Sequence, residues 1–206
     1  MADDDLDAVY ASDGAEATTR LYDRWADDYD DDMARLGYRH PAVAVALLAR
    51  HLPATQDPVL DAGSGTGQVG ELLSLLGYGH LEALDLSEQM LARAAERGVY
   101  RELHCASLDD RLPFADDHFA AAVAVGVFTT GHVSLTRVTE LVRVVRPGGV
   151  VVFTVKDEMA DALGAQVYDE LLRSGQVRSV ERTSSYLSMP GHATSTLSHA
   201  CVLTLA

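Results

Sequence analysis

Short apolar runs alternate with segments of helical periodicity along the middle of the chain. The apolar runs predict strands over residues 58–61, 81–86, 102–105, 121–127 and 150–155. The segments between them predict helices over 67–76, 87–97 and 135–145, which end at a glycine or just before Pro147. Because each connection is long enough for a crossover, the pattern predicts a parallel sheet with helices on both faces.

The C-terminal third of the chain has a different pattern. A helix is expected over 157–174, followed by two strand-like runs, 177–189 and 195–206, which Pro190 and Gly191 connect. These runs predict an antiparallel pair that closes the sheet. With the five parallel strands, the expectation is a doubly wound α/β fold with a mostly parallel sheet of seven strands.

The N-terminal part of the chain predicts a helical cap. Tyr22, Trp25 and Tyr29 recur at helical spacing among aspartates, and 41–52 is amphipathic, so helices precede the first strand. We therefore expect a helical lid over 18–52, within a single domain over 18–206. Residues 1–17 are polar and without periodicity, and we expect a disordered acidic tail there.

Net charge narrows the choice of partners. The formal charge is −15, and residues 1–32 hold twelve acidic side chains against two arginines. This field repels phosphate backbones and no basic stripe offsets it, so we predict no nucleic-acid partner. No apolar run is long enough to span a membrane, and the acidic N-terminus is unlike a signal peptide. The expectation is a cytoplasmic protein without membrane contact, whose oligomeric state the sequence leaves open.

The stretch PVLDAGSGTGQVGELL predicts a ligand-binding loop between the first strand and the following helix. Its glycines allow close backbone approach, and the helix N-terminus offers unpaired N–H groups to an anionic or acceptor-rich ligand. Asp85 ends the second strand, twenty-two residues after Gly63. An acid in that position can accept hydrogen bonds from the ribose hydroxyls of an adenosine group.

Several nucleotides compete for this loop. A nicotinamide dinucleotide is one, since Gly65, Gly67 and Gly70 satisfy GxGxxG. Asp61, however, precedes Gly63 by two residues, and an acid there suits an ammonium group better than a pyrophosphate. ATP is disfavoured because GxxxxGK[ST] is absent. The pattern favours a nucleoside that carries an amino acid, and a glycine-rich turn that binds nothing is the alternative.

The motifs VLDAGSGTG and LEALDLSEQML resemble those of the class I S-adenosylmethionine-dependent methyltransferases. The likeness continues through RLPFADDHFAAAVAV and ELVRVVRPGGVVVFTVK. It implies the Rossmann-like methyltransferase fold, methyltransferase activity and S-adenosylmethionine as cofactor. More narrowly, LYDRWADDYDDDMARLGYRHPAVAVALLARHL and VGVFTTGHV resemble the methyltransferase-like group of the Williams-Beuren syndrome region and its bacterial relatives.

The resemblance also implies a set of cofactor-binding residues. Four residues of the glycine loop would line the methionine part of the cofactor: Gly63, Ser64, Gly65 and Gly67. Two acids would add polar contacts, Asp61 near the amino group and Asp85 at the ribose. Four further side chains would border the ribose and the adenine: Leu86, Met90, Ser107 and Leu108.

The aromatic residues of the lid have two interpretations. Trp25 and Tyr29 are four residues apart and would share one face of a helix. In this superfamily such a helix often lies over the cofactor, where an aromatic face can meet the sulfonium and a phenol can reach the carboxylate. The alternative is that both rings attach the helix to the domain.

Methyl transfer from a sulfonium needs alignment and exclusion of water more than a catalytic triad or a metal. A general base matters only when the acceptor must lose a proton. His132, in TTGHV after the fourth strand, is the candidate base, and a histidine packed or solvated by chance is the alternative. Thr129 and Thr130 would shape the acceptor pocket, and Tyr38 and His40 would close it.

Metal and substrate are the remaining questions. No histidine spacing such as HExxH occurs, so we predict no metal site. The sequence therefore predicts S-adenosylmethionine-dependent methyl transfer to a small-molecule substrate that it does not identify. The alternatives are a protein methyltransferase, a cofactor-binding regulatory module without catalysis and, more distantly, a nicotinamide-dependent oxidoreductase.

Overall fold

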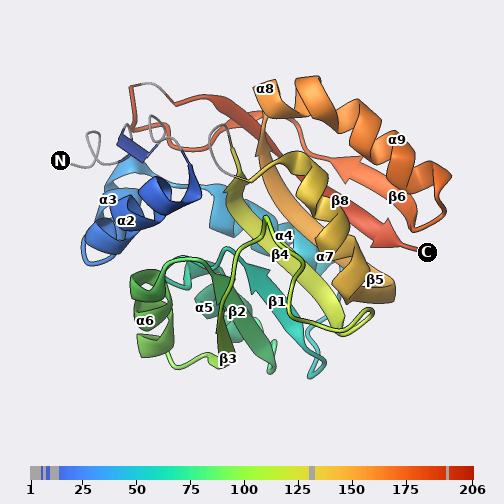
Figure 1. The fold of residues 1–206 in the computed structure, drawn as a ribbon, viewed down its shortest axis with the longest axis horizontal. Coiled ribbons are helices and arrows are strands. Elements are labelled where there is room, and N and C mark those ends of the chain that lie inside the picture. The colour runs from blue at the N-terminus through green and yellow to red at the C-terminus, as the bar shows by residue number, and fades with distance from the viewer. Residues whose placement is uncertain (1–5, 7, 10–13, 130–132, 194) are drawn as a thin grey trace.

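A central β-sheet organises the computed structural model, which describes residues 6, 8, 9, 14–129, 133–193 and 195–206. Among these residues the sheet has eight strands, seven of them in the order β3-β2-β1-β4-β5-β8-β6, with β7 paired to β8 (Figure 1). The strands are β1 (Val59–Ala62), β2 (Leu81–Asp85), β3 (Tyr100–Cys105), β4 (Phe119–Phe128), β5 (Val145–Lys156), β6 (Val177–Arg182), β7 (Tyr186–Leu187) and β8 (Leu197–Leu205).

The strand directions confirm the doubly wound α/β fold. Strands β1 to β5 pair in parallel, and β8 runs antiparallel to both β5 and β6. The antiparallel C-terminal pair is therefore present, with the two-residue β7 as an addition that the apolar pattern did not separate from its neighbour. Strand β4 and strand β5 begin earlier than the pattern indicated.

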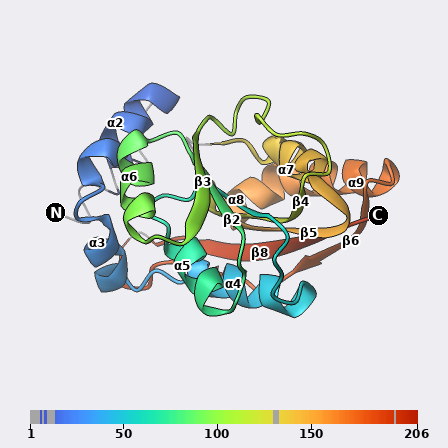
Figure 2. The ribbon, with the colours of Figure 1, turned by 90° about the horizontal axis from the view of Figure 1, so that it is seen from below.

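Helices cover both faces of the sheet (Figure 2). Helices α4 (His40–His51) and α5 (Gln68–Leu75) supply apolar side chains to one buried cluster, together with Val59, Leu81 and Val123 of the strands. Helices α7 (Val138–Val144) and α9 (Ala165–Arg173) supply another on the opposite face. Helix α6 (Glu88–Glu96) follows β2.

Local sequence signals explain several helix ends. The Ser87 hydroxyl accepts a hydrogen bond from the backbone nitrogen of Met90 at 3.1 Å, which caps α6. A 3₁₀ turn, Leu135–Arg137, precedes α7. The helix expected over 157–174 is divided into α8 (Asp157–Met159), a π-helical turn (Ala160–Gly164) and α9.

The N-terminal region consists of helices α2 (Ala15–Trp25) and α3 (Tyr29–Leu36), which lie beside α6 and ahead of α4 (Figure 1). Trp25 and Tyr29 do not belong to one helix, because a turn ends α2 and the backbone nitrogen of Asp28 donates to the carbonyl of Trp25 at 3.1 Å. Their rings nevertheless contact each other, edge to face, with centroids 4.9 Å apart.

The acidic tail differs from the expectation in its described residues. Helix α2 begins at Ala15, inside the segment that the polar pattern assigned to disorder. Leu6 and Val9 are buried in an apolar cluster with Trp25 and Met33. The side chains of Trp25 and Met33 thus provide an apolar surface on which these two tail residues pack. Among the described residues, no helix is long and apolar enough to cross a membrane.

Candidate functional site

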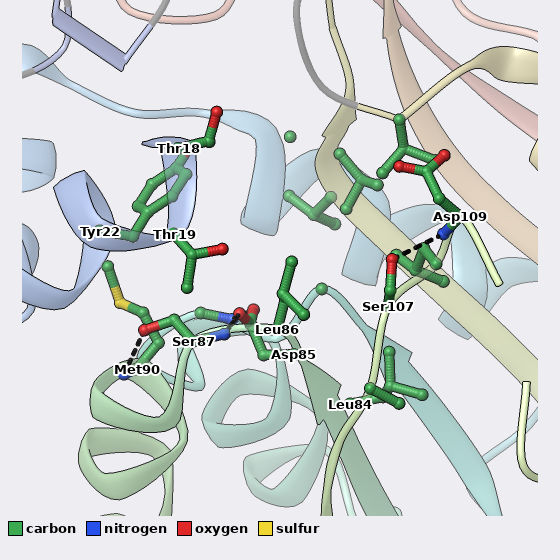
Figure 3. A pocket seen from close by; sticks show the side chains of 18 of the residues that line it. Thr18, Thr19, Tyr22, Leu84, Asp85, Leu86, Ser87, Met90, Ser107 and Asp109 are labelled. Carbon is green, nitrogen blue, oxygen red and sulfur yellow. Dashed lines mark hydrogen bonds between the residues drawn. The ribbon is translucent and has the colours of Figure 1, made fainter. Parts of the chain in front are cut away.

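A cavity of about 370 Å³ lies at the carboxyl ends of β1, β2 and β4, under helix α2 (Figure 3). Strand β1 lies between β2 and β4, so the chain connections leave this point in opposite directions. Open α/β sheets bind ligands at such a switch point. The volume lies within the range of about 300 to 1,000 Å³ that is usual for small-molecule sites.

Most of the residues expected to bind the cofactor meet at this cavity. Its lining includes Tyr29, Gly63, Gly65, Asp85, Leu86, Met90, Ser107 and Leu108. They come from the lid, from the glycine loop, from the ends of two neighbouring strands and from helix α6. The fold therefore places them around one space, as a common ligand requires.

The glycine loop needs its glycines for two different reasons. Gly63 has a φ of +75°, and a Cβ there would lie 2.4 Å from Val127 Cγ2, so a side chain does not fit. Gly65 has a φ of +53°, but a Cβ there would meet no atom within 4 Å. Gly65 also lines the cavity, so the space that its missing side chain leaves is available to a ligand.

Asp85 connects the second strand to the glycine loop. Its Oδ2 accepts a hydrogen bond from the backbone nitrogen of Gly65 at 2.8 Å, and its Oδ1 accepts one from Ser87 at 2.9 Å. Burial raises the pKa of Asp85, and the backbone donors oppose that rise. The carboxylate thus holds the loop in place while remaining part of the cavity wall.

Trp25 lies away from the cavity, which corrects the expectation that its ring covers the cofactor. The side chain is 3% exposed, in the cluster that contains Met33 and Leu36. Its Nε1 donates to Asp32 Oδ2 at 2.9 Å. Trp25 therefore attaches the N-terminal helices to each other, and Tyr29 is the member of the pair that lines the cavity.

Asp61 also lies outside the cavity lining, behind the glycine loop. It is 1% exposed, and its Oδ2 accepts a hydrogen bond from the Tyr100 hydroxyl at 2.5 Å. Burial, with a smaller contribution from the negative charge of Asp85, raises the pKa of Asp61 to about 7, although the Tyr100 hydrogen bond opposes this. Asp61 thus supports the loop from the core, and a direct contact with an amino group is not available in this arrangement.

Ser64 and Gly67 are likewise supporting residues of the loop. The Ser64 hydroxyl is buried and has no hydrogen-bond partner among the described residues. Gly67 has a φ of +86° at the start of α5, and a Cβ there would lie 3.0 Å from Tyr100 Cε2. Both positions shape the turn and neither lines the cavity.

Tyr38 reaches the cavity, but His40 does not. A Cβ on Gly126, where β4 bulges, would lie 2.6 Å from the Tyr38 hydroxyl. His40 is buried with its Nδ1 2.7 Å from the Tyr186 hydroxyl. Burial, aided by the positive charge of Lys156, lowers the pKa of His40 to about 4, so it packs as a neutral ring.

The expected general base lies outside the described residues. This applies to His132 and also to Thr130, so their roles stay predictions. Thr129 is buried and does not line the cavity, whereas Val133 does.

Sequence reasoning missed the polar side chains that α2 contributes. Thr18, Thr19 and Tyr22 line the cavity on the side opposite Ser107 and Asp109 (Figure 3). The signal was present, because residues three and four apart on a helix share a face.

Acidic residues of the N-terminal helices hold those helices against the nucleotide-binding half of the sheet. The Ser87 hydroxyl donates to Asp23 Oδ1 at 2.5 Å, and Arg93 Nε donates to Asp27 Oδ1 at 3.1 Å. Asp30 Oδ1 accepts from Thr66 Oγ1 at 2.5 Å and from Gln68 Nε2 at 2.8 Å. Three acids of this region thereby contact the glycine loop, the start of α5 and α6.

The sheet order, the glycine loop after β1 and the acid at the end of β2 define a domain of the Rossmann-like class. Comparison with known proteins narrows the choice within this fold class. The family model of the methyltransferase domain matches residues 60–153. Over these residues the chain is similar to the methyltransferases, as its motifs indicated.

Individual relatives support the same family. Methyltransferase-like protein 27 of Homo sapiens is 38% identical over 139 residues, which cover 66% of this chain and 56% of that protein. Phosphatidylethanolamine N-methyltransferase of Cereibacter sphaeroides is 34% identical over 145 residues, covering 66% of each chain. The chain thus spans between half and two thirds of these relatives.

Solved structures support the fold independently. A SAM-dependent methyltransferase from Thermotoga maritima superposes with a TM-score of 0.59 over 89% of this chain and 97% of that one. The two sequences are 17% identical, so the likeness concerns the fold.

Proposed function

We propose that this protein binds S-adenosylmethionine in the cavity at the ends of β1, β2 and β4, and transfers its methyl group to a small-molecule acceptor. One observation carries the proposal: Gly65, Asp85 and the polar face of α2 surround a single cavity of about 370 Å³. The open space at Gly65 suits close approach of the cofactor to the backbone. Asp85 supplies the carboxylate that a ribose needs.

In this proposal the residues of the chain bind the cofactor and orient it for methyl transfer. When bound, S-adenosylmethionine supplies a methyl group that is already activated as a sulfonium. The Asp85 carboxylate accepts hydrogen bonds from ribose hydroxyls, and Leu86 and Met90 pack against the nucleoside. The aromatic rings of Tyr22 and Tyr29 favour a cation nearby. Helices α2 and α3 cover the cavity and exclude water.

Two features support a small acceptor. The cavity has the size of a small-molecule site, and Thr18, Thr19 and Tyr22 of α2 form one of its sides, which narrows the space for an acceptor. Tyr38, whose hydroxyl lies against Gly126, narrows the space next to β4. The alternative, a protein methyltransferase, would need an exposed groove for a peptide. In this proposal His132 acts as a base only for an acceptor that must lose a proton. The proposal also includes a cytoplasmic location for the protein.

Titration calorimetry tests the cofactor first. The protein is titrated in parallel with S-adenosylmethionine, S-adenosylhomocysteine and NAD. We expect binding of the first two at micromolar concentration and no binding of NAD. Binding of NAD alone would instead favour the oxidoreductase alternative, and binding of none would overturn the proposal.

The Asp85→Ala variant tests the site. Loss of a buried hydrogen-bonding partner costs about 1 to 3 kcal/mol, so affinity for S-adenosylhomocysteine should fall at least about fivefold. The Asp57→Ala variant is the control, because Asp57 lies at the surface beside Arg146 and outside the cavity lining. Unchanged affinity in Asp85→Ala would remove Asp85 from the site.

A further inference from the structure

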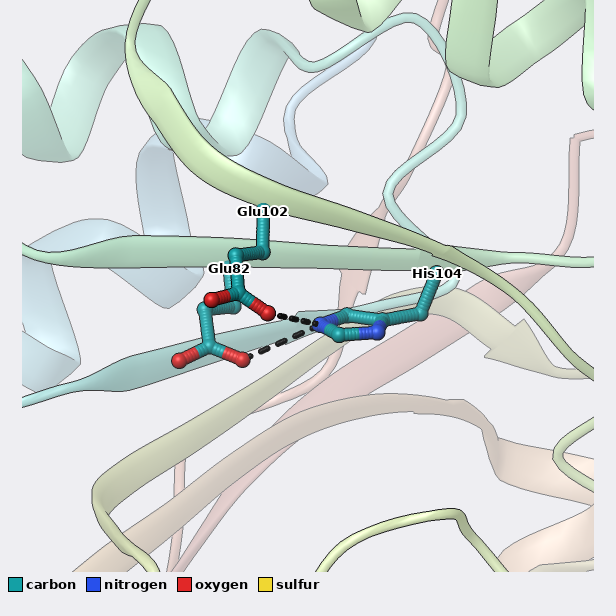
Figure 4. Close-up of side chains that lie close together, drawn as sticks. All are labelled: Glu82, Glu102 and His104. Atoms are coloured by element: carbon teal, nitrogen blue, oxygen red, sulfur yellow. Dashed lines mark hydrogen bonds and ion pairs between the residues drawn. The ribbon is translucent and has the colours of Figure 1, made fainter.

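Two strand segments of the chain each place a histidine and a glutamate at alternate positions. They are His80-Leu81-Glu82, entering β2, and Glu102-Leu103-His104, in β3. Alternate residues of a strand point to the same face of the sheet. Strands β2 and β3 pair in parallel with Glu82 beside Glu102 and Leu84 beside His104, so these side chains meet on one face (Figure 4).

Glu82 is the centre of this cluster. It is 4% exposed, and its Oε2 lies 3.1 Å from His104 Nε2. Its Oε1 lies 3.2 Å from His80 Nε2 and 3.7 Å from His118 Nε2. Glu102 Oε2 lies 3.7 Å from His104 Nε2, on the solvent side. Three imidazoles therefore converge on one buried carboxylate, and a second carboxylate approaches one of these imidazoles.

We propose that this cluster, the His–Glu site, binds a divalent cation of the zinc class through Glu82, Glu102 and His104. The candidate ligand atoms of these three residues lie within 4.8 Å of one another. Ligands about 2.0 to 2.1 Å from a tetrahedral ion are roughly 3.3 Å apart, so small side-chain adjustments bring them to an ion. Imidazole and carboxylate ligands without thiolate suit Zn²⁺ and its neighbours.

His80 and His118 approach the other oxygen of Glu82 and flank the group of three ligands. Water would supply the fourth ligand of the ion. Phe114 lies edge-on to His104 with ring centroids 4.8 Å apart, and stacks on His118 at 6.3 Å. Such packing restricts the imidazole orientations, as the support around metal ligands commonly does.

The His–Glu site is separate from the cofactor cavity. None of its five residues lines that cavity. The three proposed ligands belong to β2 and to β3, the edge strand of the sheet, so a bound ion would tie these two strands together. We expect the bound ion to stabilise the edge of the sheet and to have no part in methyl transfer. Sequence spacing does not indicate this site, because its ligands come from two neighbouring strands and meet only through the register of β2 on β3.

Metal titration of the whole chain tests the proposal. The protein is dialysed against a chelator and then titrated with Zn²⁺ alone by calorimetry, and with Co²⁺ alone by visible absorption. We expect one Zn²⁺ per chain, an absorption band for Co²⁺ at a site of low coordination number, and a higher melting temperature with Zn²⁺. Absence of Zn²⁺ binding by the wild-type chain would overturn the proposal and leave the cluster as hydrogen bonds that satisfy Glu82.

Three variants locate the ion. Glu102→Gln and His104→Gln should each weaken Zn²⁺ binding at least about tenfold, the lower range for losing even an outer-shell partner of a metal. Glu102 has a side chain that is 66% exposed, so its variant should fold normally. His51→Gln is the matched control, because His51 also lies near a glutamate, 3.5 Å from Glu181, outside the cluster. Wild-type affinity in both Glu102→Gln and His104→Gln would reject the site.

Discussion

The hydroxyl of Tyr100 lies 2.5 Å from Oδ2 of Asp61 and donates a hydrogen bond to it. The same hydroxyl accepts a hydrogen bond from the backbone nitrogen of Gly70 at 3.2 Å. One side chain of β3 thus connects the central strand β1 with helix α5 underneath the glycine loop. The contact explains how an acid that is 1% exposed is tolerated in the core.

Removal of this hydroxyl should destabilise the fold. In Tyr100→Phe the buried Asp61 carboxyl loses its donor, and we expect a loss of about 1 to 3 kcal/mol in the free energy of unfolding. Urea denaturation followed by circular dichroism measures it. Tyr168→Phe is the control, since the Tyr168 hydroxyl pairs with the Cys201 sulfur, a weak hydrogen-bonding partner, at 3.4 Å, and its loss should cost less. Equal losses in the two variants would contradict the special role of the Asp61 contact.

The raised pKa of Asp61 makes stability depend on pH. The pKa rises from the ordinary 3.8 to about 7 in the folded protein, mainly through burial. Folding therefore favours the protonated acid, and this contribution is complete below the unfolded pKa and is lost as the pH rises through about 7. Asp61→Asn removes the titration.

Urea denaturation of both proteins at about pH 5 and about pH 8 measures this effect. Between these values the wild type should lose more free energy of unfolding than Asp61→Asn does. Equal losses would mean that Asp61 does not titrate in this range.

The sheet could be predicted from the sequence because its parallel strands are buried on both faces. Such strands appear as continuous apolar runs, and β4 is the clearest example, with Phe119 and Phe128 both buried at its ends. The helix cap at Ser87 and the glycine loop could also be predicted, because each depends on a short local stretch of sequence. The cavity residues after β1, β2 and β3 could be anticipated because parallel strands end at one edge.

The misassigned residues depend on contacts that the sequence does not contain. Asp61 turns to Tyr100, and only the pairing of β1, β2 and β3 brings that tyrosine to it. Trp25 and Tyr29 continue the helical spacing of Tyr22, so the hydrophobic pattern does not indicate the turn between α2 and α3. The cluster around Glu82 likewise requires the register of β2 on β3.

Gly65 and Gly98 form a matched pair for testing the cavity. Both have a positive φ, +53° and +64°, and a Cβ at either would meet no atom within 4 Å. Alanine at each position should therefore cost a similar backbone strain of about 1 to 2 kcal/mol. Only Gly65 lines the cavity.

We expect Gly65→Ala to weaken S-adenosylhomocysteine binding about tenfold, a loss of roughly 1.4 kcal/mol, and Gly98→Ala to leave it unchanged. Calorimetry gives the affinities, and urea denaturation gives the strain. Equal affinities for the two variants would mean that the ligand does not approach the loop at Gly65.

Asp30 is the residue through which α3 holds the glycine loop. It contacts Thr66, Gln68 and Arg97. Asp30→Ala should release the lid, and because exposed ion pairs are weak, we expect a cost of about 1 kcal/mol. Hydrogen exchange should then become faster in residues 15–36 and remain unchanged in residues 138–144.

Asp57→Ala serves as the control for the lid, since it removes a similar surface pair, Asp57 with Arg146 at 2.5 Å, away from α3. It should leave exchange in residues 15–36 as in the wild type. If Asp30→Ala also leaves that exchange unchanged, the apolar cluster around Trp25 and Met33 is sufficient to hold the helices, and the acids of the lid contribute charge without closing it. If exchange accelerates and cofactor affinity falls with it, then closure of the lid and binding are coupled through Asp30, because opening the lid also exposes Thr66 of the glycine loop.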